Sequence, residues 1–171
     1  GALNIYGDFH IGTTTEYWSY ATHFDRTALS GSERAVSVSI AANATTSVDG
    51  GALQIIGVLG NETTITNQGS GTYALAVSDG TFTAQYYALR NLSAAGLSLT
   101  GAPSILSLAF GDYELAVDGG SLLSVSSTTV NANASLVIPG SRFATTTAIT
   151  GTNVSLTGVT SNAWTYTGHT G

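Results

Sequence analysis

The sequence predicts an all-β fold in which short parallel strands stack coil upon coil, a β-solenoid. Three observations carry this prediction. Apolar and polar residues alternate in short runs, turns that contain glycine separate these runs, and blocks of sequence recur along the chain. No stretch shows the periodicity of an amphipathic helix.

The alternating runs indicate strands with one buried face, because successive side chains of a strand point to opposite sides. They are VSVSI at 36–40, YALAV at 73–77, LSL at 97–99 and YELAV at 113–117. Turns that suit a positive φ at glycine lie between them: DGG at 49–51, DG at 79–80, GAP at 101–103 and DGG at 118–120. We therefore expect short strands joined by tight corners.

The recurring blocks set the expected coil length. GTYALAVSDG at 71–80 and GDYELAVDGG at 111–120 lie forty residues apart, which equals two coils of about twenty residues. Tyr73 would then lie in the same face as Tyr113. VDGGALQI at 48–55 and VDGGSLLS at 117–124 are 69 residues apart, so the repeat is degenerate and contains insertions. We expect one domain over residues 1–171, with residues 1–30 as an N-terminal cap or irregular first coil.

A β-sandwich is the alternative fold. An antiparallel sandwich joins alternating runs by hairpin turns, and only the turn at Asp79 and Gly80 fits that pattern well. The other turns are more typical of solenoid corners, so the solenoid is favoured.

Three stretches resemble the right-handed parallel β-helix regions of large bacterial secreted and cell-surface proteins. They are the opening Gly1, Leu3, Ile5, Gly7 and Phe9, the stretch GTFTAQYYALRNLSAAGLSLTG at 80–101, and SRFATTTAITGTNVSLTG at 141–158. This resemblance implies a right-handed solenoid that acts as a stalk, adhesin or matrix component. It implies an extracellular or cell-surface location and carries over no catalytic residue.

Composition excludes several classes of partner. Hydrophobic residues make up 43% of the chain, which excludes a disordered protein, and charged residues only 8%, about a third of the usual share. There is no lysine, and the net charge is -6, so nucleic acid and anionic membranes would be repelled. No apolar run is long enough to insert into a bilayer. The lack of cysteine excludes disulfides and thiolate metal sites.

Asp112, Glu114 and Asp118 form the strongest charged motif. They occupy alternate positions and are expected to face outward as an acidic stripe, which is either a solvated face that blocks aggregation or a Ca²⁺ site. We expect no other cofactor. Arg90 and Arg142 are expected on other coils than the stripe, so the carboxylate–arginine arrangement of polysaccharide-active enzymes is not predicted. We expect no catalytic activity.

Aromatic residues supply the candidate binding surface. Exposed rings can stack on the apolar faces of sugars or anchor an interface, although packing in the core is the alternative for each. The three groups are Tyr17, Trp18 and Tyr20; Tyr86 and Tyr87; and Trp164 and Tyr166.

Five asparagines stand in glycosylation acceptor sequences, which chance also produces in a chain rich in serine and threonine. They are Asn43, Asn61, Asn91, Asn133 and Asn153.

Two functions remain after these exclusions. The first is an extracellular structural scaffold, a stalk, matrix component or filament subunit that self-associates through the solenoid ends or faces. The alternative is an adhesin or carbohydrate-binding module that contacts cell-surface glycans through its aromatic residues.

Overall fold

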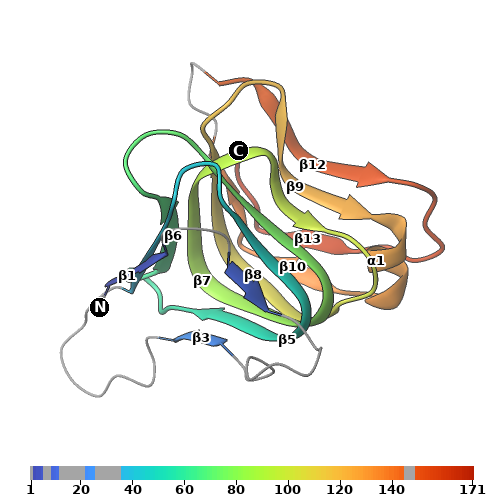
Figure 1. The fold of residues 1–171 in the computed structure, drawn as a ribbon. Helices are drawn as coiled ribbons and strands as arrows, with labels where there is room; N and C mark the ends of the chain where they lie inside the picture. Colours follow the sequence, from blue (N-terminus) through green and yellow to red (C-terminus); the bar gives the residue numbers. More distant parts are fainter. Residues whose placement is uncertain (1, 6–8, 12–21, 26–35, 145–148) are drawn as a thin grey trace.

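The computed structural model describes residues 2–5, 9–11, 22–25, 36–144 and 149–171, and it confirms a parallel β-solenoid of about five turns. The successive coils lie side by side in Figure 1, from the blue N-terminal strands to the orange and red C-terminal ones. All pairings between the named strands are parallel, which excludes the β-sandwich alternative.

The strands fall into three stacks, which form the sides of the solenoid. The first stack contains β1 (Ala2–Ile5), β4 (Ser37–Ile40), β6 (Thr63–Asn67), residues 87–92 of β7 (Tyr73–Leu99), residues 111–115 of β8 (Ser104–Leu115), and β11 (Arg142–Phe143). The second contains β2 (Phe9–Ile11), residues 45–48 of β5 (Thr45–Ile56), residues 74–77 and 97–99 of β7, β9 (Gly120–Ser126) and β12 (Gly151–Thr157). The third contains β3 (Thr22–Asp25), residues 52–56 of β5, 81–85 of β7 and 104–109 of β8, β10 (Val137–Pro139) and β13 (Thr165–Thr167).

One short helix, α1 (Ser127–Ala132), interrupts this pattern between β9 and β10. Its N-cap is Ser126, whose hydroxyl accepts a hydrogen bond from Thr129 N at 3.2 Å. Thr129 and Val130 are buried, so the helix closes its coil in place of a corner. No helix among the described residues is long and apolar enough to cross a membrane.

The coils are longer than the expected twenty residues. From β5 onward, partners in neighbouring coils are between 23 and 31 positions apart, as in Thr81 with Ser104 and Gly120 with Gly151. The forty-residue repeat is therefore not two coils. Tyr73 lies in the second stack and Tyr113 in the first, so the expectation that they share a face is wrong. The two sequence blocks are alike because every side of the solenoid requires alternating apolar and polar residues followed by a corner.

Residues with positive φ turn the chain from one side to the next. The strand β7 is 27 residues long and covers all three sides, because it bends at Gly80, Tyr86, Asn91 and Gly96, whose φ angles lie between 48° and 78°. The turn at Asp79 and Gly80, which fits the hairpin pattern of the β-sandwich alternative, is one of these corners. Left-handed backbone costs little at glycine but about 1–2 kcal/mol at other residues.

Inward side chains form columns that run along the solenoid axis. Burying each apolar member contributes about 1.5–3 kcal/mol, and each member also supports its neighbours in the coils on either side. The column of the first stack is in register and buried throughout; it consists of Val38, Ile65, Leu89, Tyr113 and Phe143.

Neighbouring coils approach each other closely at the corner formed by Gly96. A methyl group added there would lie 2.0 Å from Ser121 O and 2.3 Å from Leu122 O. We expect Gly96→Ala to lower the free energy of unfolding by about 2–4 kcal/mol, because backbone atoms must move. Gly60, with φ +79° and nothing within 4 Å of the added methyl group, is the matched control. Gly60→Ala should lower the free energy of unfolding by about 1 kcal/mol, because only the left-handed backbone disfavours alanine there.

Chemical denaturation of both variants measures this difference. Equal losses would show that the close approach of the coils at Gly96 is not a constraint on the fold.

Candidate functional site

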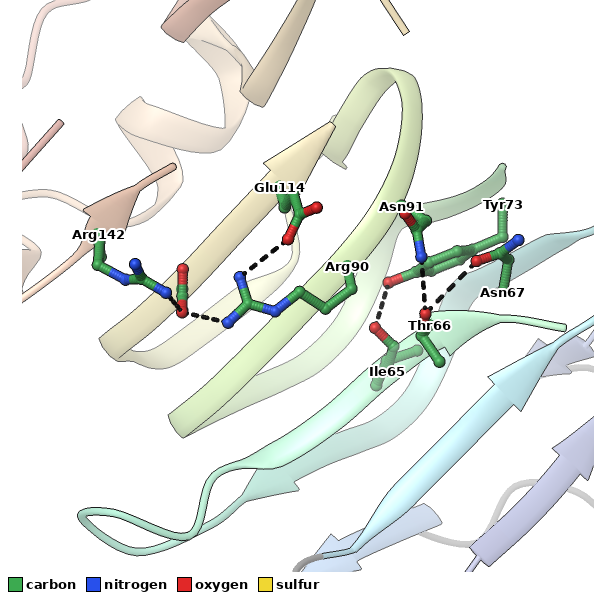
Figure 2. A network of polar contacts seen from close by, with 9 residues as sticks. Ile65, Thr66, Asn67, Tyr73, Arg90, Asn91, Glu114 and Arg142 are labelled. Atoms are coloured by element: carbon green, nitrogen blue, oxygen red, sulfur yellow. Dashed lines mark hydrogen bonds and ion pairs between the residues drawn. The ribbon is translucent and has the colours of Figure 1, made fainter. Parts of the chain in front are cut away.

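Among the residues that the structure describes, the largest cluster of charged side chains lies on the outer face of the first stack. Asp112 pairs in register with Ala88 in the preceding coil and with Arg142 in the following one. Arg90 and Arg142 both donate to Asp112 Oδ2, and Arg90 Nη1 also donates to Glu114 Oε2 at 3.3 Å. Figure 2 shows Arg90 reaching toward Glu114, with Arg142 on the neighbouring coil. We call these four residues the ion ladder.

The ion ladder joins three successive coils and carries no net charge. The arginines lie on other coils than the carboxylates, as expected, but these coils are adjacent, and paired strands are only about 4.8 Å apart. Partial burial alone would lower the pKa of Arg90, but the hydrogen bonds to Asp112 and Glu114 and their negative charges raise it. Asp112 is only 16% exposed, so its removal would leave Arg90 partly buried without its main partner.

Asp118 does not belong to this cluster. It lies in the turn after β8, where its Oδ1 accepts hydrogen bonds from Thr150 N at 2.7 Å and Thr150 Oγ1 at 3.2 Å. The expected acidic stripe is therefore divided: Asp112 and Glu114 belong to the ion ladder, and Asp118 is bonded to Thr150. The described part of the chain holds no group of three or more His, Asp or Glu side chains suited to a metal ion. A cation at Asp112 would have to compete with two arginines, and Ca²⁺ binding there stays a prediction.

An uncharged polar pocket lies near the ion ladder, where the first stack turns toward the second. Asn91 Nδ2 donates to Thr66 Oγ1 at 3.1 Å (Figure 2). Asn67 Nδ2 donates to Gly69 O at 3.0 Å. The open pocket beside them has a volume of about 290 Å³, and Ser70 also lines it. Both side-chain amides are used to hold the corner.

A second set of polar contacts joins the coils around α1. Asn133 Oδ1 accepts from Ile105 N at 2.7 Å, and Asn133 Nδ2 donates to Pro103 O at 2.9 Å. Trp164 Nε1 donates to Asn133 O at 3.0 Å from the following coil. Asn133 therefore links the coils on both sides of α1, and Trp164 is anchored by its polar end.

The five glycosylation candidates differ in the hydrogen bonds and the exposure of their side chains. The side-chain nitrogens of Asn91, Asn133 and Asn153 each donate a hydrogen bond within the protein. Asn61 is partly buried, and Asn43 is exposed at a corner with φ 63°. Asn43 is the acceptor best placed for modification.

The aromatic candidates fall into different environments. Tyr17, Trp18 and Tyr20 lie outside the described residues. Tyr87 is fully buried, and Trp164 and Tyr166 pack against the core, so the alternative of core packing applies to these three. Tyr86 is partly exposed.

Tyr86 stacks on a residue that the sequence analysis did not single out. Its ring is parallel to that of Phe110 in the next coil, with centroids 4.6 Å apart and an angle of 5° between the planes. Phe110 is 41% exposed. Both have positive φ at the same corner, where other coils place Gly140 and Gly168. We call Tyr86 and Phe110 the aromatic corner.

Buried tyrosines fill the interior beneath the ion ladder. The hydroxyls of Tyr87 and Tyr113 are hydrogen-bonded to each other, and the ring of Tyr113 stacks on that of Phe143 at 5.4 Å. Tyr166 Oη is buried, and among the described residues it has no hydrogen-bond partner. Burial raises the pKa of Tyr166 to about 12 and raises the pKa of Tyr87 and Tyr113 further.

Family models, curated proteins and solved structures were all compared with this chain, and none matches it. The fold and the placement of its side chains are therefore the main basis for a functional proposal.

The buried tyrosines predict that the protein loses stability in alkali. An exposed tyrosine in the unfolded chain ionises near pH 10, whereas the buried phenols hold their protons to higher pH. The unfolded state therefore binds fewer protons above pH 10, and the free energy of unfolding should fall as pH rises from about 10 towards 12. Tyr166→Phe should weaken this dependence.

Urea unfolding at increasing pH, with phenolate absorbance followed in parallel, measures the effect. Titration of all eight tyrosines near pH 10 in a still folded protein would contradict the burial described above.

Proposed function

We propose that this chain is a non-catalytic structural scaffold module that works in the extracellular space or at the cell surface. The ion ladder is the observation that carries the proposal. Its carboxylates and arginines, the groups that polysaccharide-active enzymes turn toward a substrate, here bind one another across three coils. Their role in this reading is to hold the coils together.

The columns of the interior support the same role. Each coil packs on its neighbours through in-register apolar side chains, so the coils form one continuous stack. Asn133 and Asp118 add polar links between coils. A stack of this kind suits a stalk or matrix component, which holds other parts at a fixed separation.

The extracellular location rests on the resemblance and on composition. A surface covered by threonine, serine, asparagine and glycine with few charges suits a secreted or surface-anchored structural protein. The exposed acceptor Asn43 is compatible with that setting.

Incubation with a panel of acidic and neutral polysaccharides tests the absence of catalysis. We expect no new reducing ends and no unsaturated products. Product formation that Asp112→Asn abolishes would overturn the proposal, because the ion ladder would then be a catalytic site. Arg142→Gln, which removes the most exposed member, is the companion variant for assigning such an activity.

The aromatic corner favours carbohydrate binding as a second candidate function. Two bulky residues adopt left-handed backbone where glycine would avoid the strain, and such outliers often mark functional sites. Asp112 follows Phe110 by two positions in β8 and also faces outward. A pyranose against the ring edges would therefore find hydrogen-bonding groups of the ion ladder close by.

Phe110→Gly tests this candidate while preserving the corner. Glycine relieves about 1–2 kcal/mol of backbone strain, which offsets the lost stacking of about 0.5–1.5 kcal/mol, so stability should change little. If the corner binds glycans, affinity on a glycan array should fall about three- to tenfold. Leu106→Ala removes an exposed apolar side chain elsewhere and is the control.

A wild-type protein that binds no glycan, or a Phe110→Gly variant that binds as well as the wild type, would remove this candidate.

A further inference from the structure

Three successive coils contribute to the open polar pocket between the first and second stacks. Asn67 ends β6 and residues 69–72 follow it, Asn91 lies in β7, and Ala116 and Val117 follow β8. Its volume of about 290 Å³ is at the lower end of the range for small-molecule sites, about 300–1,000 Å³. The pocket therefore suits a ligand about as large as one sugar residue. We call it the amide pocket.

The backbone at Asn91 is unusual for a residue with a side chain. Asn91 lies within an irregularity of register, where residues 89–92 of β7 match residues 113–115 of β8. Its φ is 59°, a left-handed conformation that glycine adopts without strain. The chain thus has a carboxamide at a position where the backbone alone favours glycine, and such outliers often mark functional sites.

A chain of hydrogen bonds fixes the orientation of the two amides. Asn91 Nδ2 donates to Thr66 Oγ1 at 3.1 Å, and Thr66 Oγ1 donates to Asn67 Oδ1 at 3.4 Å (Figure 2). Asn67 Nδ2 donates to Gly69 O at 3.0 Å. Asn67 is only 7% exposed, so the pocket has a buried amide that is already oriented.

These bonds leave hydrogen-bonding capacity for a ligand. A carboxamide nitrogen carries two donor hydrogens, so Asn67 Nδ2 keeps a second N–H. Within the described part of the chain, Asn91 Oδ1 and the hydroxyls of Ser70 and Thr72 have no hydrogen-bond partner. The pocket therefore offers an oriented donor, an oriented acceptor and two hydroxyls that can do either.

The chemistry of the pocket favours a neutral ligand. None of the residues that line it has a titratable side chain. Arg90 precedes Asn91, but its guanidinium is bound in the ion ladder, so an anionic ligand would find no free cation. Ala116 and Val117 add a small apolar surface. A pyranose has both features that this lining requires, hydroxyls that donate and accept and an apolar C–H face.

We propose that the amide pocket binds one neutral sugar residue, whose hydroxyls donate to Asn91 Oδ1 and accept from Asn67 Nδ2. This site is distinct from the aromatic corner. The amide pocket lies where the first stack turns to the second, whereas Tyr86 and Phe110 lie where the third turns to the first. The inference goes beyond the scaffold role, because it gives the scaffold a neutral glycan to hold.

NMR titration of the 171-residue chain tests the inference. The ligands are the methyl glycosides of glucose, galactose, mannose and N-acetylglucosamine, and the readout is the side-chain amide signals of Asn67 and Asn91. We expect at least one glycoside to shift both signals, with millimolar affinity because an open pocket covers little of its ligand. Glucuronate and galacturonate should bind no more tightly than their neutral counterparts.

Asn91→Gly removes the carboxamide and keeps the left-handed backbone. It should weaken binding about three- to tenfold, as expected for the loss of one hydrogen bond. Asn43→Gly is the matched control, because Asn43 has φ 63° at a corner but does not line the pocket, and it should bind as the wild type does. Ser70 is exposed, so Ser70→Ala tests the same pocket with folding intact and should weaken binding about twofold.

Three outcomes would overturn the inference. They are no shift at either asparagine with any of the four glycosides, unchanged binding in both Asn91→Gly and Ser70→Ala, and tighter binding of the acidic sugars. Binding that is lost in Phe110→Gly but kept in Asn91→Gly would place the sugar at the aromatic corner instead. None of these results touches the scaffold proposal, which fails only if the protein releases products from polysaccharides.

Discussion

The structure depends on the register between neighbouring coils. Once Leu89 lies between Ile65 and Tyr113, the inward columns, the ion ladder and the contacts of Asn133 all follow from the same alignment. A shift of one residue would move every inward side chain of a strand to the outer face. The polar links are therefore less important for their own free energy than for specifying this alignment, since exposed ion pairs contribute about 1 kcal/mol or less.

The corners determine which side chains meet on the outside. Positive φ at Gly80, Tyr86, Asn91 and Gly96 turns β7 across all three sides without ending the strand. The same corner in successive coils then brings Tyr86 and Phe110 together, although 24 positions separate them in the sequence. The aromatic corner and the ion ladder both arise in this way, from one position repeated in neighbouring coils.

The sequence was sufficient to predict strands, corners and stacking, because alternation and glycine turns are local signals. It was not sufficient to predict the coil length. The pattern Tyr-x-Leu-x-Val suits any side of a solenoid, so the similar blocks at Tyr73 and Tyr113 suggested a shared face that does not exist. Without the coil length, contacts across coils could not be assigned. Arg90 and Arg142 were therefore placed away from Asp112, and Phe110 was missed as the partner of Tyr86.

The unequal coil lengths have a consequence for how this fold accepts change. Pairings join residues between 23 and 31 positions apart. The entropic cost of closing the longest loop exceeds that of the shortest by only about 0.3 kcal/mol. Extra residues inserted at a corner therefore cost the chain almost nothing, provided that the inward columns keep their alignment. The coil that contains α1 already shows such an addition. New surface loops can thus arise at the corners while the interior stays the same. The solenoid can therefore gain new surface contacts without any change in its core.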